Sequence, residues 1–318
     1  MKRFPRLLTW LSFPLVAAVC VAVCHQRLIP LIPTVSASAA GAQTAAPAGT
    51  PDQGQDPAAV NIAPAGPSYT TEAPPPAQAG APAQGPDDAD YAEQPTETAT
   101  QPPPALPVYQ QPPAPADGYI WQPGYWAWSP TGYYWVPGAW VEPPYEGALW
   151  TPGYWGFYGA RYSFYPGHWG LHIGFYGGIN YGFGYIGLGY EGGYWNGGHF
   201  FYNRVYNNIN VRTVHNVYRY NAGNRVASAP RTSYRGGPGG VQTRPRPSEG
   251  AAWHEPTAPR MNSQVQHAQT YSAVRGQYAA QNHGKPASPA VSKPLAADRN
   301  VKPTVRAQSA PRGGEGRR

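Results

Sequence analysis

Two glutamates in the middle of the chain come closest to the spacing of a catalytic pair. Glu142 and Glu146 stand four positions apart, and a glycosidase works with two carboxylates that flank the bond to be cleaved. These two flank Pro143-Pro144 instead, and such a turn is an ordinary place for solvated charges. No Ser, Cys or Lys stands in a recognisable nucleophile setting. The sequence therefore predicts no enzyme.

Histidines in the same part of the chain raise the question of a metal site. His168 and His172 are four positions apart, and His199 and His215 follow. On a helix the first two could share a metal ion, but segment 166–174 contains one proline and three glycines, which disfavour a helix. We therefore interpret these histidines as surface or turn residues and predict no metal.

Glycine motifs of the dinucleotide-binding type occur twice. Gly182–Gly187 and Gly187–Gly192 both match G-x-G-x-x-G. The fingerprint indicates nucleotide binding only where it follows a strand and opens a helix in a βαβ unit, and the sequence shows no such unit. Glycine is so frequent in this segment that chance accounts for both matches, so no cofactor is predicted.

The aromatic residues are concentrated in one part of the chain. The sequence has 40 prolines and 38 glycines, a proportion typical of low complexity. Nine of the 11 tryptophans and 18 of the 24 tyrosines nevertheless lie between Tyr119 and Tyr220, whereas disordered chains are poor in aromatic residues. We expect one folded all-β domain at residues 119–221. Its stability must come from packing, because both cysteines, Cys20 and Cys24, lie outside it.

Four copies of a hexapeptide dominate this domain. Each copy has an aromatic residue, a variable residue, Pro-Gly, a variable residue and Trp. The glycines, Gly124, Gly138, Gly153 and Gly167, are spaced 14, 15 and 14 residues apart. A fixed period indicates a repeat architecture, and this spacing suits two short strands and two turns.

The Pro-Gly dipeptides predict the turns of the repeat. Proline fits the second position of a β-turn, and glycine accepts the positive φ that type II requires at the third. The four glycines would then define four hairpins, with the two aromatic residues of each copy facing each other on paired strands. Because an isolated hairpin is only marginally stable, we expect the copies to stack into a small antiparallel repeat sheet.

These strings resemble the WXXGXW (also called YXWGXW) repeat proteins of bacterial envelopes. The resemblance covers Trp121–Trp169 and extends into the glycine-rich Gly177–Tyr185 and the asparagine-rich Phe200–Tyr220, together about a third of the chain. It implies export and an all-β repeat body, and it implies no activity. The fourth copy has Phe164 in place of the first tryptophan, which leaves its packing open.

The tryptophans of the repeats have two interpretations. They form the core of a small sheet, or some remain exposed as a platform that stacks on a sugar or a peptide, since large exposed apolar patches usually mark interaction sites. The sequence leaves both alternatives open. The residues concerned are Trp121, Trp126, Trp135, Trp140, Trp150, Trp155 and Trp169.

The N-terminus has the pattern of an export signal or a membrane anchor. Basic residues precede Leu7–Cys24, an uncharged and largely apolar run of 18 residues, and Ala37-Ser38-Ala39 offers a cleavage site at the end of segment 1–39. The run also reaches the lower limit for a spanning helix, so an uncleaved N-terminal apolar helix in the inner membrane is the alternative. We expect an exported protein of the periplasm, the outer envelope or the extracellular space.

Two arms flank the predicted domain. Residues 40–118 are acidic and rich in proline and alanine, and residues 222–318 are basic. Neither arm has enough large apolar residues to offset its ordering entropy, so both are predicted to be disordered. Outside the cytoplasm the basic tail is expected to bind anionic lipid or polysaccharide rather than nucleic acid.

The sequence thus predicts a non-catalytic structural or interaction protein of the bacterial envelope. It would act through self-association or adhesion of its aromatic β repeat surface. The alternative is a carbohydrate-binding module that uses exposed Trp and Tyr faces, with the basic tail holding acidic polysaccharide.

Overall fold

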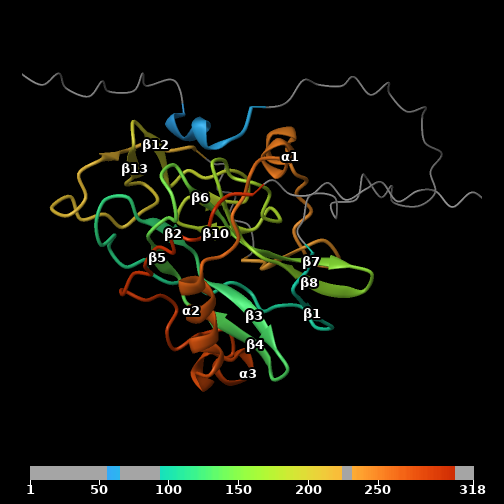
Figure 1. Cartoon of the computed structure of the whole chain (residues 1–318). Helices are drawn as coiled ribbons and strands as arrows, with labels where there is room; N and C mark the ends of the chain where they lie inside the picture. The colour runs from blue at the N-terminus through green and yellow to red at the C-terminus, as the bar shows by residue number, and fades with distance from the viewer. Residues whose placement is uncertain (1–55, 65–93, 224–230, 305–318) are drawn as a thin grey trace, which may run out of the picture. The chain divides into compact units, whose positions relative to one another are not determined.

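The computed structural model describes residues 56–64, 94–223 and 231–304, all of which belong to one compact unit, Thr50–Arg318. Short strands form small, mainly antiparallel sheets, with three α-helices in the described ranges, so the predicted all-β fold class is confirmed. Figure 1 labels most of these elements. They are η1 (Pro57–Asn61), β1 (Glu97–Ala99), β2 (Ile120–Gln122), β3 (Tyr125–Ser129), β4 (Gly132–Val136), β5 (Ala139–Val141), β6 (Leu149–Thr151), β7 (Tyr154–Tyr158), β8 (Arg161–Tyr165), β9 (His168–Gly170), β10 (Asn180–Gly182), β11 (Tyr185–Ile186), β12 (Gly193–Asn196), β13 (His199–Asn203), β14 (Val217–Tyr218), β15 (Tyr234–Arg235), α1 (Pro247–Trp253), α2 (Asn262–Ser272), η3 (Arg275–Gln277) and α3 (Ala279–Asn282).

The first two copies of the repeat form one long hairpin. Strand β2 pairs with β5, and β3 pairs with β4. Trp121 faces Trp140 in the first pair of strands, and Trp126 faces Trp135 in the second. The register is the same on both sides of the Pro-Gly dipeptides, so the hairpin runs from Ile120 to Val141.

The third and fourth copies form a second hairpin of the same design. Strand β6 pairs with β9, which places Trp150 opposite Trp169, and β7 pairs with β8, which places Trp155 opposite Phe164. The phenylalanine of the fourth copy therefore takes the same position as the tryptophan of the others. The repeat body consists of two equivalent hairpins, each built from two copies.

The Pro-Gly dipeptides lie inside these hairpins and not at their turns, which corrects the predicted turn assignment. None of Gly124, Gly138, Gly153 and Gly167 has a positive φ. In each hairpin the two dipeptides lie opposite each other and interrupt the ladder, because proline has no N–H to donate. The turns lie between copies, for example at residues 159–160, where φ is +54° and +65°.

A tyrosine from the glycine-rich segment links the two hairpins. The hydroxyl of Tyr185 lies 2.8 Å from the carbonyl oxygen of Trp150 and 3.3 Å from that of Trp121. Trp121 and Trp150 are equivalent residues of the two hairpins. The hairpins also touch directly, since the indole N–H of Trp155 donates to the carbonyl oxygen of Trp126 at 2.8 Å.

The folded region begins well before Tyr119. Strand β1 pairs with β8, and the carbonyl oxygen of Pro112 accepts the indole N–H of Trp140 at 2.8 Å. Residues 94–118 thus pack on the repeats, whereas the sequence predicted disorder throughout 40–118. A proline-rich segment can bind in this way because prolines offer carbonyl oxygens without an N–H that needs a partner of its own.

The folded region also extends past Asn221. The structure departs from the predicted disordered tail at 222–318, because residues 231–304 contain β15 and all three described α-helices. Helix α2, drawn in orange in Figure 1, lies beside β4. Few large apolar residues are involved; the segment instead buries amide side chains, such as those of Gln264 and Gln277, against the repeats.

One hydrophobic core includes both hairpins, the glycine-rich segment and part of residues 231–304. Its largest fully buried side chains are mostly tryptophan and tyrosine. The predicted signal or anchor at 1–39 lies outside the described residues. Within the ranges that the structure describes, no helix combines the length and the apolar character needed to cross a bilayer.

Candidate functional site

The tryptophans of the repeats are buried. Their exposed fractions range from 0% to 3%, so these rings form the core of the body and offer no face to a sugar or a peptide. Of the two interpretations that the sequence left open, the structure supports packing for these seven residues. They are Trp121, Trp126, Trp135, Trp140, Trp150, Trp155 and Trp169.

The rings that face each other across the hairpins form close aromatic pairs. Their centroids lie 5.1 to 5.3 Å apart with interplanar angles of 47° to 71°. Tilted and edge-to-face pairs of this kind contribute roughly 0.5–1.5 kcal/mol each beyond the burial of their area. The pairs are Trp121–Trp140, Trp126–Trp135, Trp150–Trp169 and Trp155–Phe164.

The glycines of the repeats make room for these rings. A Cβ atom placed at Gly124 would lie within 3.0 Å of the ring of Trp135, and one placed at Gly138 would meet the ring of Trp121 in the same way. The second hairpin repeats this arrangement, with Phe164 over Gly153 and Trp150 over Gly167. The first aromatic residue of each copy therefore occupies the space left by the glycine of its partner copy.

Several indole N–H groups of the repeats find acceptors outside the repeats. Trp126 donates to the carbonyl oxygen of Ala105 at 3.2 Å, and Trp135 donates to that of Pro289 at 2.9 Å. A buried indole needs such a partner, because an unpaired polar group in a core is costly. The flanking segments thus complete the core, and sequence reasoning missed them because their composition resembles that of disordered chains.

A buried amide joins residues 231–304 to both hairpins. Oε1 of Gln264 accepts from the indole N–H of Trp169 and from the backbone N–H of Met261, both at 2.9 Å. Its Nε2 donates to Oε1 of Gln122 at 2.6 Å. Gln264 was not identified from the sequence. It lies in the first turn of α2 and belongs to no motif that would have marked it.

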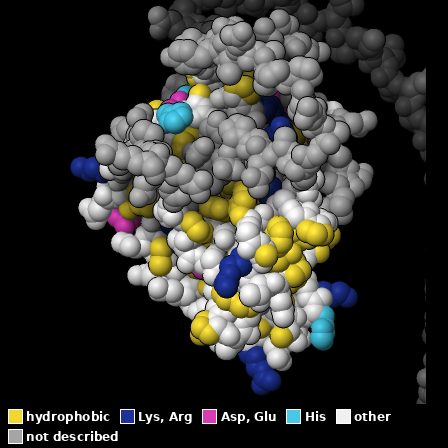
Figure 2. Space-filling model, turned by 90° about the vertical axis from the view of Figure 1, so that its right-hand side faces the viewer, with side chains coloured by type: hydrophobic (Ala, Val, Ile, Leu, Met, Phe, Trp, Pro, Cys, Tyr) yellow, Lys and Arg dark blue, Asp and Glu magenta, His cyan; other side chains and the backbone are white. Residues whose placement is uncertain are grey.

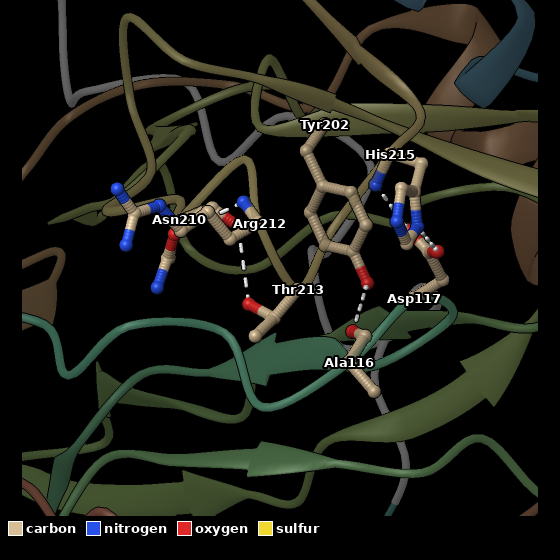
Figure 3. A network of polar contacts seen from close by, with 7 residues as sticks. All are labelled: Ala116, Asp117, Tyr202, Asn210, Arg212, Thr213 and His215. Carbon is tan, nitrogen blue, oxygen red and sulfur yellow. Dashed lines mark hydrogen bonds and ion pairs between the residues drawn. The ribbon is translucent and has the colours of Figure 1, made fainter.

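A polar network holds residues 116–119 against Tyr202 on β13 and the loop that follows, and Figure 3 shows its part at Ala116 and Asp117. The hydroxyl of Tyr202 donates to the carbonyl oxygen of Tyr119 at 2.8 Å, and Nδ1 of His215 lies 2.8 Å from the carboxylate of Asp117. Partial burial acts to raise the pKa of Asp117, but hydrogen bonds from His215 outweigh it and hold that pKa below its usual value. The arrangement fastens the chain and lies at an exposed position.

The other candidate side chains from the sequence are dispersed over different contacts. Glu142 pairs with Arg299 at 2.5 Å, and Nδ1 of His172 lies 2.8 Å from Glu255. Within the described ranges, no three His, Cys, Asp or Glu side chains are grouped so that they could hold a metal ion. The two glycine motifs at 182–192 lie on β10, β11 and the loop that follows, rather than at the start of a helix.

Three tryptophans of the described residues are half-buried, Trp128, Trp195 and Trp253, and one of them borders a groove. Trp195 on β12 lines an open groove of about 250 Å³ together with Glu146, Asn196 and three glycines. Its indole N–H donates to the carbonyl oxygen of Ala148 at 3.1 Å, which fixes the orientation of the ring. Glu146 approaches the tip of the β12–β13 hairpin, since a Cβ atom at Gly198 would lie 2.8 Å from its Oε1.

Apolar side chains elsewhere on the surface are divided into smaller groups. On the face shown in Figure 2 they lie in separate clusters with Lys and Arg side chains between them. A second groove, of about 740 Å³, lies between the proline-rich segment 104–108 and residues 279–289. The candidate surfaces for recognition are therefore these two grooves and the edges of the strands.

A family model for the WXXGXW repeat matches two copies in residues 117–141. The chain thus carries WXXGXW repeats, and the matched segment corresponds to the first hairpin, which ends at Val141. Neither the comparison with curated proteins nor the comparison with solved structures gives a significant match.

Proposed function

We propose that this WXXGXW repeat protein is an exported, non-catalytic structural or interaction protein of the bacterial envelope that associates with copies of itself. The export pattern at 1–39 supports the location. The buried pairing of the repeat tryptophans supports the structural role. The repeats build a rigid body without disulfides. Partners would therefore bind to the surfaces around the repeats and not to the repeat tryptophans.

The reciprocal packing of rings on glycines carries this proposal. A binding module presents its aromatic rings to a ligand, whereas here each repeat ring lies over the glycine of a partner copy or against a ring of that copy. The side chains that define the motif are thus used inside the molecule. What the motif specifies is a scaffold, which suits a protein whose role is to hold its place in an assembly.

The location and the association are tested separately. Mass spectrometry of the protein from fractionated cells gives the mature N-terminus, and cleavage after Ala39 is expected for the exported form. Sedimentation velocity of the purified protein over a range of concentrations is expected to show species larger than a monomer. A strict monomer at the highest attainable concentration contradicts self-association, and recovery in the cytoplasmic fraction with Met1 intact contradicts export.

The groove at Trp195 supports a second candidate function, the binding of a carbohydrate. The C–H face of a pyranose ring packs on aromatic side chains, and the carboxylate of Glu146 and the amide of Asn196 line the same groove, where they could accept and donate hydrogen bonds to hydroxyl groups. In this second candidate function the sugar would bind at the half-buried ring of Trp195, which lies outside the repeats. It replaces the platform of repeat tryptophans that the sequence suggested.

A matched pair of variants tests the carbohydrate site. Trp195→Ala is expected to abolish binding of oligosaccharides from envelope polysaccharides, measured by calorimetry. Tyr194→Ala is the control, because neighbouring residues of a strand point to opposite faces and Tyr194 stacks on Phe201 instead. No binding by the unmodified protein, or equal loss in both variants, removes this candidate.

A further inference from the structure

Residues 231–304, here called the strap, cover the outer edge of the first hairpin. The backbone N–H of Leu295 donates to the carbonyl oxygen of Trp140 at 2.8 Å, and the carbonyl oxygen of Leu295 accepts from the N–H of Glu142 at 2.9 Å. These bonds run past the end of β5 in a parallel arrangement, with Val141 as the bridge partner of Leu295. The strap thus pairs with β5 as an added strand would.

The strap pairs with the other repeat strands in the same way. Ala258 exchanges two backbone hydrogen bonds of 2.8 Å with Trp169 on β9, and β15 pairs in parallel with β7. Each of these contacts occupies backbone groups that a sheet edge would otherwise leave open. The strap pairings are Tyr134–Tyr278 on β4, Gly138–Ala290 directly before β5, Val141–Leu295 on β5, Trp155–Tyr234 on β7 and Trp169–Ala258 on β9.

An open strand edge is a template for another chain. Edges that lack a cover promote pairing between molecules, and natural proteins protect them. Here the protection comes from a segment that follows the body in the sequence. Its contacts combine main-chain hydrogen bonds with buried side chains, among them Met261 in the core and Gln277, which donates to the carbonyl oxygen of Trp135 at 3.2 Å. None of these contacts requires the strap and the body to belong to the same chain.

We propose that copies of this protein associate by strap exchange, in which the strap of one chain covers the strand edges of another. This inference rests on the proposed self-association and names the surface that performs it: the outer edges of β4, β5, β7 and β9. The occupant is a second copy, because its strap is complementary to all of these edges at once. Exchange of an identical element is a low-cost route to oligomers, since it needs no new interface.

The balance between the two arrangements depends on concentration. A strap tethered to its own body has an effective concentration on the order of millimolar, so the intrachain form dominates in dilute solution. Exchange becomes competitive when the protein is concentrated to a similar level or when chains fold side by side. An envelope protein confined to a thin layer meets that condition more readily than a dilute one.

A disulfide across the strap contact reports which chain supplies the strap. Val141→Cys and Leu295→Cys place two thiols at bridge partners, within the separation that a disulfide spans, in a full-length chain that also carries Cys20→Ser and Cys24→Ser. The protein is refolded from denaturant at about 10 µM, well below the effective concentration of the tether, and at about 1 mM, which reaches it. It is then oxidised and run on a non-reducing gel.

Strap exchange predicts covalent dimers or ladders whose share rises several-fold at the higher concentration. The control pair, Asn196→Cys and His199→Cys, faces across the β12–β13 hairpin and is expected to give crosslinked monomer at both concentrations. Near-ultraviolet circular dichroism of the reduced proteins verifies that both variants fold. Intrachain crosslinks alone at 1 mM overturn the inference. If sedimentation shows oligomers in that same sample, the proposed self-association stands and proceeds through another surface.

Discussion

The ring of Trp135 lies over Gly124, so close that a single added methyl group at position 124 would collide with it. The partner copy returns the contact, with Trp121 over Gly138. The glycine of the motif is therefore required for space, and its φ is one that any residue can adopt. This changes what a substitution at these positions should do.

Gly124→Ala should destabilise the protein by about 1–3 kcal/mol, the usual cost of forcing extra volume into a packed core. Where an alanine fits, the same change would stabilise by about 0.4–1 kcal/mol, because it restricts the unfolded chain. The sign of the effect thus separates a site where the added methyl group collides from one where it fits. Denaturant unfolding followed by tryptophan fluorescence measures it.

Gly174→Ala is the matched control for this substitution. A Cβ atom at Gly174 would meet its nearest neighbours at 3.4 to 3.7 Å, which is ordinary contact, so this variant should be neutral or slightly more stable. Trp135→Phe combined with Gly124→Ala should recover part of the loss, since a smaller ring leaves room for the methyl group. An unchanged midpoint for Gly124→Ala alone would refute the close contact.

Gln264→Ala should cost at least about 2 kcal/mol, because it removes the partner of several buried polar groups at once. These are the indole N–H of Trp169, the backbone N–H of Met261 and the side chain of Gln122. Gln266→Ala, at an exposed position of the same helix, controls for helix propensity and should have little effect. Equal stability of the two variants would show that the amide network does not hold α2 in place.

Glu249 should contribute a loss of stability as the pH rises from about 4.5 to 7. Burial raises the pKa of this carboxyl to about 7, against hydrogen bonds from the backbone of Arg246 and Gly189 that lower it. The folded state therefore holds the proton more tightly than the unfolded state in this range. The stability contributed by the protonated Glu249 carboxyl is fully present below its pKa in the unfolded state. It is lost as the pH rises through its pKa in the folded state.

The loss amounts to at most about 3 kcal/mol, at about 1.4 kcal/mol per pH unit. The free energy of unfolding, measured by denaturant titration between pH 4 and 8, should decline less steeply in Glu249→Gln than in the unmodified protein. Comparing the two slopes cancels other titrating groups that both proteins share. Parallel curves would assign the pH dependence to residues other than Glu249.

The strand content of the repeats could be read from the sequence, but their pairing could not. A Pro-Gly dipeptide fits a type II turn and an interruption of a ladder equally well, and only the packing of Trp135 on Gly124 decides between them. The true turn at residues 159–160 has a positive φ at both Gly159 and Ala160, and only the glycine carries a sequence signal. The period of the glycines identified the repeat, and the register depended on contacts between copies.

The ends of the folded body were predicted wrongly from the sequence for a different reason. Residues 94–118 and the strap have few large apolar side chains, so composition assigned them to disordered arms. They fold because the repeats offer indole donors and open strand edges that they satisfy, as the carbonyl of Pro112 does for Trp140. These segments are ordered by their contacts with the repeats. Their own sequences, taken alone, therefore do not predict that they fold.

The mutual fit of ring and glycine also limits how this protein can change in length. One extra copy of the hexapeptide would bring a ring without a glycine to receive it and a strand without a neighbour. Two extra copies would supply both and add a complete hairpin. Duplications and losses compatible with folding should therefore come in steps of two copies, so that related chains carry even numbers of the motif.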